Sequence, residues 1–139
     1  MISLIYVSSA THLMSSEELL NILRISQMKN EERAVTGMLL YMSGNFMQVL
    51  EGDEEAVRET YKKILQDDRH TGVTLLVEEP IVERQFEKWT MAFRNLDEEI
   101  ARRERAFSEF LQDEFTGDKY REKPELAYKM LLRFKEDMR

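Results

Sequence analysis

The apolar positions of this chain follow two periods, and the change from one to the other predicts the order of its elements. Short apolar runs rich in strand-forming residues occupy positions 2–8, 34–42, 46–51, 72–82 and 89–96, which predicts five strands. Apolar residues at helical spacing occupy 15–30 and 54–67, which predicts two helices among these strands. The predicted order is therefore βαββαββ.

Local signals support three of the predicted boundaries. Ser15 and Glu18 have the spacing of a capping box at the start of the first helix. Residues 43–45 form a tight turn between the second and third strands, with Gly44 where a positive φ is expected. Asp53 is expected to cap the second helix.

The element order predicts a ferredoxin-like fold of the α/β (α+β) class, an open sheet with both crossover helices on one face. We expect residues 1–96 to form this domain, because the composition becomes charge-rich after that point. Residues 97–139 are expected to form an extension of two amphipathic helices, the second beginning at Pro124. Three of the strands are apolar on both faces, so these helices are expected to cover the opposite face of the sheet. A second subunit is the other place where their apolar stripes could be buried.

Composition then narrows the classes of function. The 139 residues and 42% hydrophobic content fit one domain with a real core. A net charge of -7 argues against nonspecific nucleic-acid binding and against a basic membrane-binding patch. The chain has no cysteine, which fits a cytoplasmic location, and no run near the ~20 apolar residues of a membrane span. The two histidines lack metal-ligand spacing, so no metal site is expected.

Four polar residues lie where the pattern predicts apolar surroundings. Tyr6 and Gln48 lie within apolar strands, and Ser26 and Asn30 follow Ile22 at helical spacing. Each alone has an ordinary explanation: a half-buried tyrosine, a solvated glutamine, a serine bonded to the preceding turn, and a helix-capping asparagine. Together they are expected to point into one space between the helices and the sheet. Since unpaired buried amides are costly, the four residues predict a common polar partner.

These residues and their spacing resemble those of the BLUF family, flavin-binding sensors of blue light. The stretches that carry the resemblance are LIYVSSAT around Tyr6, ERAVTGMLLY after Asn30, GNFMQVLEG around Gln48, and the later DDRH and RQFEKWTMAF. The resemblance covers roughly residues 1–96, and the two expected C-terminal helices resemble those of short, single-domain members. It implies a photoreceptor that binds FAD noncovalently between the two helices and is not an enzyme.

The resemblance also implies a role for individual residues. Tyr6 matches the electron donor of the light reaction, and Gln48 matches the amide between that tyrosine and the flavin. Asn30 matches the residue that binds the polar edge of the flavin, and Trp89 and Met91 match the signalling residues of strand 5. The other cofactor contacts that it implies are Ser8, Ile22, Ser26, Lys29, Lys63, Ile64, Asp67, Arg69 and His70.

The mechanism implied by the family is a proton-coupled electron transfer from Tyr6 to the flavin. A tyrosine with an ordinary pKa of about 10 is neutral, so loss of its electron must be coupled to loss of its proton. Recombination leaves the hydrogen bonds of Gln48 rearranged. The signal then passes through strand 5 and the C-terminal helices to a protein partner or to a homo-oligomer. The chain after residue 96 is expected to be too short for a cyclase or phosphodiesterase domain.

Two other functions stay open at this point. One is a ferredoxin-like ligand-binding or assembly module without photochemistry, which would keep the fold and lack colour. The other is an enzyme, such as a flavin reductase or an acylphosphatase-like hydrolase. The sequence shows no nucleophile–base pair and no glycine-rich anion loop for such an enzyme. The presence of Tyr6, Asn30 and Gln48 together favours the photoreceptor.

Overall fold

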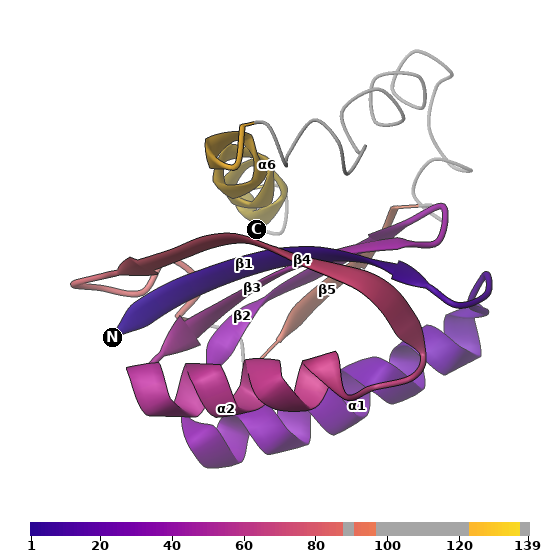
Figure 1. Ribbon diagram of the computed structural model, residues 1–139, viewed down its shortest axis with the longest axis horizontal. Helices are drawn as coiled ribbons and strands as arrows, with labels where there is room; N and C mark the ends of the chain where they lie inside the picture. The colour runs from indigo at the N-terminus through magenta and orange to yellow at the C-terminus, as the bar shows by residue number, and fades with distance from the viewer. Residues whose placement is uncertain (88–90, 97–122, 137–139) are drawn as a thin grey trace.

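The computed structural model describes residues 1–87, 91–96 and 123–136 and shows a five-stranded sheet between helices (Figure 1). The strands are β1 (Ile2–Ala10), β2 (Thr36–Met42), β3 (Asn45–Gly52), β4 (His70–Pro80) and β5 (Ala92–Asn95). The helices are α1 (Ser16–Arg33), α2 (Glu54–Leu65) and α6 (Glu125–Glu136). The strand order is β4-β1-β3-β2-β5, with β5 parallel to β2 and the other pairs antiparallel. This confirms the predicted ferredoxin-like βαββαββ order.

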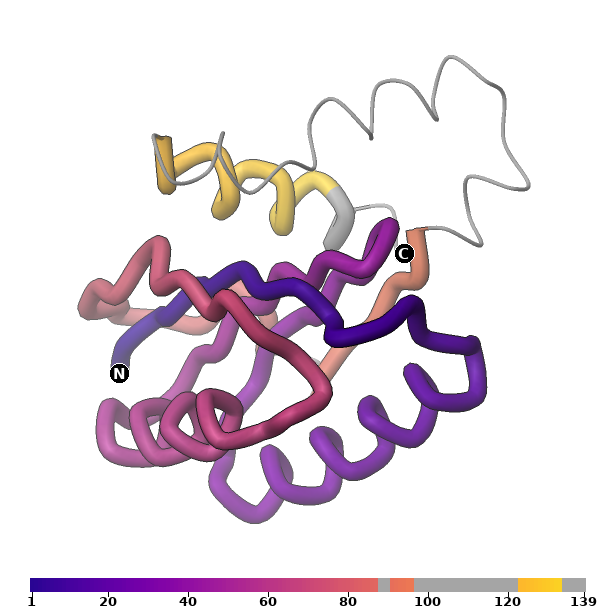
Figure 2. The backbone as a smooth tube through the Cα atoms, turned by 45° about the vertical axis from the view of Figure 1, so that its right-hand side comes forward, coloured from indigo at the N-terminus to yellow at the C-terminus, as the bar shows by residue number. Residues whose placement is uncertain are grey.

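The two faces of the sheet carry different helices. Figures 1 and 2 show α1 and α2 on one face and α6 on the other. Successive side chains of β1 point to opposite faces of the sheet. Leu4 and Tyr6 pack on the side of α1 and α2, whereas Ile5 and Val7 pack on the side of α6. The expected covering of the second face is confirmed for α6, and the other expected C-terminal helix lies outside the described residues. None of the described helices has the length and apolar character that a membrane crossing needs.

Two predicted boundaries are wrong: the end of α1 and the start of β2. Helix α1 continues past Asn30 to Arg33, and Ala34, expected in a strand, ends the helix in the left-handed conformation with φ 55°. The N–H of Val35 then donates to the carbonyl oxygen of Asn30 at 2.9 Å. An alanine followed by β-branched residues resembles a strand start, so the sequence pattern did not reveal this cap.

The predicted capping box and turn are confirmed, and the predicted side-chain cap at Asp53 is not. The capping box is present, since the Ser15 hydroxyl accepts from the Glu18 N–H at 3.2 Å and the Glu18 carboxylate accepts from the Ser15 N–H. Gly44 has φ 79°, as the hairpin turn requires. Asp53 occupies the N-cap position of α2, but its side chain makes no capping hydrogen bond.

A buried carboxylate holds the segment between β4 and β5 against the sheet. Glu51 is fully buried, and its oxygens accept from the backbone N–H of Gln85 at 3.0 Å and of Phe86 at 2.7 Å. The neighbouring Arg84 donates to the carbonyl oxygen of Ala34 at 2.6 Å and to that of Glu51 at 3.3 Å. The segment is therefore tied both to β3 and to the end of α1.

We expect Glu51→Ala to lower the free energy of unfolding by about 2–3 kcal/mol, because it removes the carboxylate that accepts from two backbone N–H groups, one of them in the buried Phe86. Glu51→Gln keeps one acceptor oxygen and should cost less. Urea unfolding followed by circular dichroism measures both. Glu32→Ala, at an exposed position of α1, is the matched control and should stay within about 0.5 kcal/mol of the native protein. Equal effects at Glu51 and Glu32 would contradict the role of Glu51.

Candidate functional site

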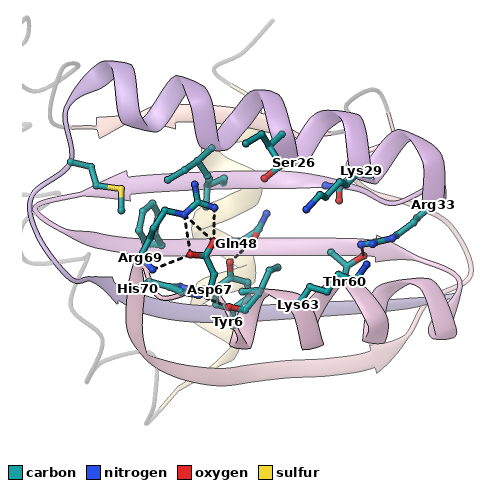
Figure 3. A pocket seen from close by; sticks show the side chains of 17 residues that line it. Tyr6, Ser26, Lys29, Arg33, Gln48, Thr60, Lys63, Asp67, Arg69 and His70 are labelled. Atoms are coloured by element: carbon teal, nitrogen blue, oxygen red, sulfur yellow. Dashed lines mark hydrogen bonds and ion pairs between the residues drawn. The ribbon is translucent and has the colours of Figure 1, made fainter.

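A cleft lies between α1, α2 and the centre of the sheet (Figure 3). Most of the residues expected at a cofactor site line it: Tyr6, Ile22, Ser26, Lys29, Asn30, Gln48, Lys63, Ile64, Asp67, Arg69 and His70. Six residues that were not expected at the site also line the cleft: Met14, Ile25, Arg33, Leu39, Phe46 and Thr60.

The floor of the cleft carries a buried chain of hydrogen bonds. Tyr6 and Gln48 oppose each other in the β1–β3 register and are only 3% and 4% exposed. The Tyr6 hydroxyl donates to Gln48 Oε1. Gln48 Nε2 in turn donates to the sulfur of Met91 at 3.3 Å, just before β5. The chain Tyr6–Gln48–Met91 therefore links the centre of the cleft to the edge strand.

The Gln48 amide has hydrogen-bonding capacity left for a ligand. A primary amide offers two N–H donors and two oxygen lone pairs. Within the described part of the chain, Gln48 uses one donor on Met91 and one lone pair on Tyr6. The sulfur of Met91 is a weak acceptor, so this orientation of the amide is held mainly by Tyr6. A ligand with both a donor and an acceptor atom at its edge would complete the set.

Burial raises the pKa of Tyr6 far above its usual value, and the nearby Tyr61 and Asp67 add to this effect. The two tyrosine rings lie 5.7 Å apart between centroids, in a tilted arrangement. Because the phenolate would be desolvated, Tyr6 stays a neutral hydrogen-bond donor through the whole physiological pH range.

One end of the cleft is polar and internally paired. The Arg69 guanidinium beside Asp67, with Nη2 and Oδ2 2.5 Å apart, holds the pKa of that carboxyl below its usual value. His70 Nε2 donates to the carbonyl oxygen of Ile64 at 2.6 Å, and its Nδ1 forms a hydrogen bond with the Ser8 hydroxyl 2.8 Å away. Ser8 thus does not line the cleft but fixes a histidine that does.

The walls of the cleft are aliphatic. Ile22 and Ile25 of α1 face Ile64 of α2 across it, and all three are half-buried. Of the apolar residues of α1, only Leu19 is fully buried. Ile22 and Ile25 lack part of their packing surface because the cleft lies beneath them. Flat apolar walls over a polar floor fit a heteroaromatic ring.

The other end of the cleft is cationic. Lys29 and Arg33 of α1 and Lys63 of α2 line it, together with Thr60, whose hydroxyl accepts a hydrogen bond from Arg33 Nη1 at 3.2 Å. Arg33 was missed because the first helix was predicted to end at Asn30. One more helical turn places it on the same side of α1 as Lys29, which is the signal that the sequence offered.

Of the two expected signalling residues, Met91 and Trp89, only Met91 lies among the described residues. Met91 does not line the cleft, but its sulfur contacts Gln48, and its carbonyl oxygen accepts from Gln27 Nε2 at 3.1 Å. Met91 is therefore in contact with both the floor of the cleft and α1. Trp89 lies outside the described residues.

Comparison with known proteins agrees with this geometry. The family model described as sensors of blue light using FAD, BLUF, matches residues 1–92. The chain belongs to the BLUF family. The family description names FAD, a flavin, as the ligand that BLUF domains use. The neutral Tyr6, the partly used Gln48 amide and the aliphatic walls fit such a ring.

Individual proteins are similar to this chain over different shares of their length. Subunit alpha of the photoactivated adenylate cyclase of Euglena gracilis is 46% identical over 86 residues, 62% of this chain but only 8% of that protein. The dark-state structure of the BLUF protein BlrB is 27% identical, with a TM-score of 0.74 and 94% of each chain covered. A bacterial light-regulated adenylyl cyclase structure is 34% identical, with a TM-score of 0.75, covering 96% of this chain and 40% of its own.

The raised pKa of Tyr6 gives a test of this BLUF site by titration. A folded-state pKa above the unfolded value means that folding favours the protonated form, so stability is retained below about pH 10 and lost as the pH rises further. We expect native protein and Tyr6→Phe to show the same phenolate absorbance up to about pH 11, since Tyr6 does not ionise there while the protein stays folded. A smaller phenolate signal in Tyr6→Phe would contradict the buried, neutral state of Tyr6.

Proposed function

We propose that this BLUF protein is a blue-light photoreceptor that holds FAD noncovalently in the cleft between α1 and α2. The observation that supports it best is the buried Tyr6–Gln48–Met91 chain at the floor of a cleft with aliphatic walls. Ile22 and Ile64 would flank the ring. The polar contacts would come from Gln48 and from Ser26, Asn30, Asp67, Arg69 and His70, with Lys29 and Lys63 at the mouth and Ser8 acting through His70.

The bound flavin supplies the absorption of blue light and an electron acceptor. Tyr6 is the electron donor of the cleft, and it loses its hydroxyl proton along the bond to Gln48 Oε1 as it loses the electron. The two losses are coupled because a charged Tyr6 would be desolvated at 3% exposure. When the electron and proton return to Tyr6, the Gln48 amide is left turned or tautomerised, with a different set of donors and acceptors facing the same partners.

The rearranged amide changes the contact that carries the signal. With its N–H groups re-aimed, Gln48 no longer donates to the Met91 sulfur in the same way. Met91 is also tied to Gln27 of α1 and directly precedes β5, whose Ala92 packs in the same core as α6. A change at Met91 thereby reaches the far face of the sheet. This is a two-state element biased by light.

In this proposal residues 1–96 form the sensor and residues 97–139 the helical extension that presents the output. The output is a change in a homo-oligomer or in the surface offered to a protein partner. The chain itself acts as a sensor and not as an enzyme, in contrast to the cyclases that carry similar domains. A role for Trp89 in the same switch and a cytoplasmic location stay predictions from the sequence.

The absorption spectrum of the purified protein, before and after blue light, tests the function. We expect a flavin spectrum that moves to longer wavelength and returns in darkness. Gln48→Leu should abolish the shift, because leucine cannot exchange donors and acceptors. Tyr6→Phe should abolish it as well, because phenylalanine has no hydroxyl proton to give up.

Tyr61→Phe is the matched control for this experiment. Its ring lies 5.7 Å from that of Tyr6, but its hydroxyl makes no bond to Gln48, so the shift should persist. A normal shift in Gln48→Leu would refute the role of the amide. A colourless protein that does not take up FAD would favour the binding or assembly module, and bleaching to reduced flavin would favour a redox enzyme.

The proposed signal route makes a separate prediction at Met91. Met91→Leu keeps the side-chain volume but removes the sulfur that accepts from Gln48 in the structure. Where the transition state of the return already contains this weak bond, removing up to ~1 kcal/mol from it should slow the return to the dark spectrum by up to about fivefold. The light-induced change in amide hydrogen exchange within α6 should also become smaller. Met28→Leu, on the exposed side of α1, should leave both measurements as in the native protein; no change in either measurement in Met91→Leu would refute the route.

A further inference from the structure

The cationic end of the cleft has no role in the light reaction described above. Figure 3 shows Lys29, Arg33, Thr60 and Lys63 together, at the end away from Asp67, Arg69 and His70. Lys29 and Arg33 are one turn apart on α1, and Thr60 and Lys63 are three residues apart on α2. The four side chains therefore face one another across the mouth of the cleft from two different helices.

The charges at this end are poorly compensated by the protein. Among the residues that the structure describes, neither Lys29 nor Arg33 forms an ion pair, and Lys63 has only an exposed contact with Glu59 at 3.8 Å. Arg69 at the other end is neutralised by Asp67. Within residues 1–87, 91–96 and 123–136, that Lys63–Glu59 contact is the only ion pair that a carboxylate makes with this cluster. Three cations at one cleft mouth call for an anion.

Arg33 is held in place for such an anion. Its Nη1 donates to the Thr60 hydroxyl at 3.2 Å, and that hydroxyl donates in turn to the carbonyl oxygen of Ala56 at 2.9 Å. Thr60 is buried, at 6% exposure, so the guanidinium has a fixed anchor on the opposite helix. A guanidinium has five N–H donors, and this anchor uses one of them. The others can make the paired, charge-assisted hydrogen bonds that suit phosphate oxygens.

We propose that Arg33, anchored by Thr60 and assisted by Lys29 and Lys63, forms a phosphate site that makes the cleft select phosphorylated flavins over riboflavin. The inference rests on the proposed flavin function and adds the group that sets the affinity for its nucleotide form. The ring takes the aliphatic walls and the Gln48 floor, and the phosphate takes the cationic end. FMN and FAD both satisfy the site, and riboflavin satisfies only the ring portion.

The test is the affinity of the protein for riboflavin, FMN and FAD, measured by flavin fluorescence on rebinding to the protein after the flavin is removed. The native protein should bind FMN and FAD at least about tenfold more tightly than riboflavin, as expected for charge-assisted hydrogen bonds at a partly exposed site. Raising the salt concentration should reduce this preference. Arg33→Met should weaken FMN and FAD about tenfold and riboflavin little, and Arg33→Lys should recover part of the loss.

Lys62→Met is the matched control, because Lys62 is an exposed cation of α2 next to Lys63 that does not line the cleft. It should keep the native ratio of FAD to riboflavin affinity. Equal affinity of the native protein for all three flavins would overturn the phosphate site, as would an equal loss for all three in Arg33→Met. Either result leaves the photoreceptor proposal standing, provided that bound flavin still shows the light-induced shift. A protein that binds no flavin would overturn both.

Discussion

The hydrogen bond between Tyr6 and Gln48 is the constraint on which the site depends. Both side chains are almost fully buried on adjacent central strands, so neither can leave the other without an unpaired polar group in the core. The bond needs β1 and β3 to be neighbours, as the split βαβ order makes them, and it needs the register that sets Tyr6 opposite Gln48. The fold thus places a neutral phenol against a reorientable amide at the centre of the sheet, where solvent cannot compete for either.

The helices on the two faces of the sheet are packed to different degrees. On the far face, Ala127 and Leu131 of α6 are fully buried against the sheet. On the near face, Ile22 and Ile25 of α1 stay half-buried because a cleft separates them from α2. A ligand in that cleft would complete the near core, so its binding should stabilise the fold by mass action. The same molecule would serve both as reactive group and as packing element.

Contacts at the edge of the sheet join these two faces. The Glu51 carboxylate holds the backbone before β5, Arg84 reaches the end of α1, and Gln27 donates to the Met91 carbonyl oxygen. Met91 therefore lies between the reorientable amide, the first helix and the edge strand. A change of partners at Gln48 acts on a residue that is already fixed on its other sides, which favours a switch between discrete arrangements over a gradual response.

The sequence by itself determined the element order, the capping box at Ser15 and the resemblance that singled out Tyr6 and Gln48. These rest on periodicity and on local residue spacing, which depend on neighbours along the chain. Only the tertiary structure decided that α1 continues to Arg33 and that this guanidinium meets Thr60, because the contact joins two helices whose separation is set by packing on the sheet. The partner of the Glu51 carboxylate was likewise hidden, since a backbone N–H more than thirty residues away leaves no signature in the local pattern.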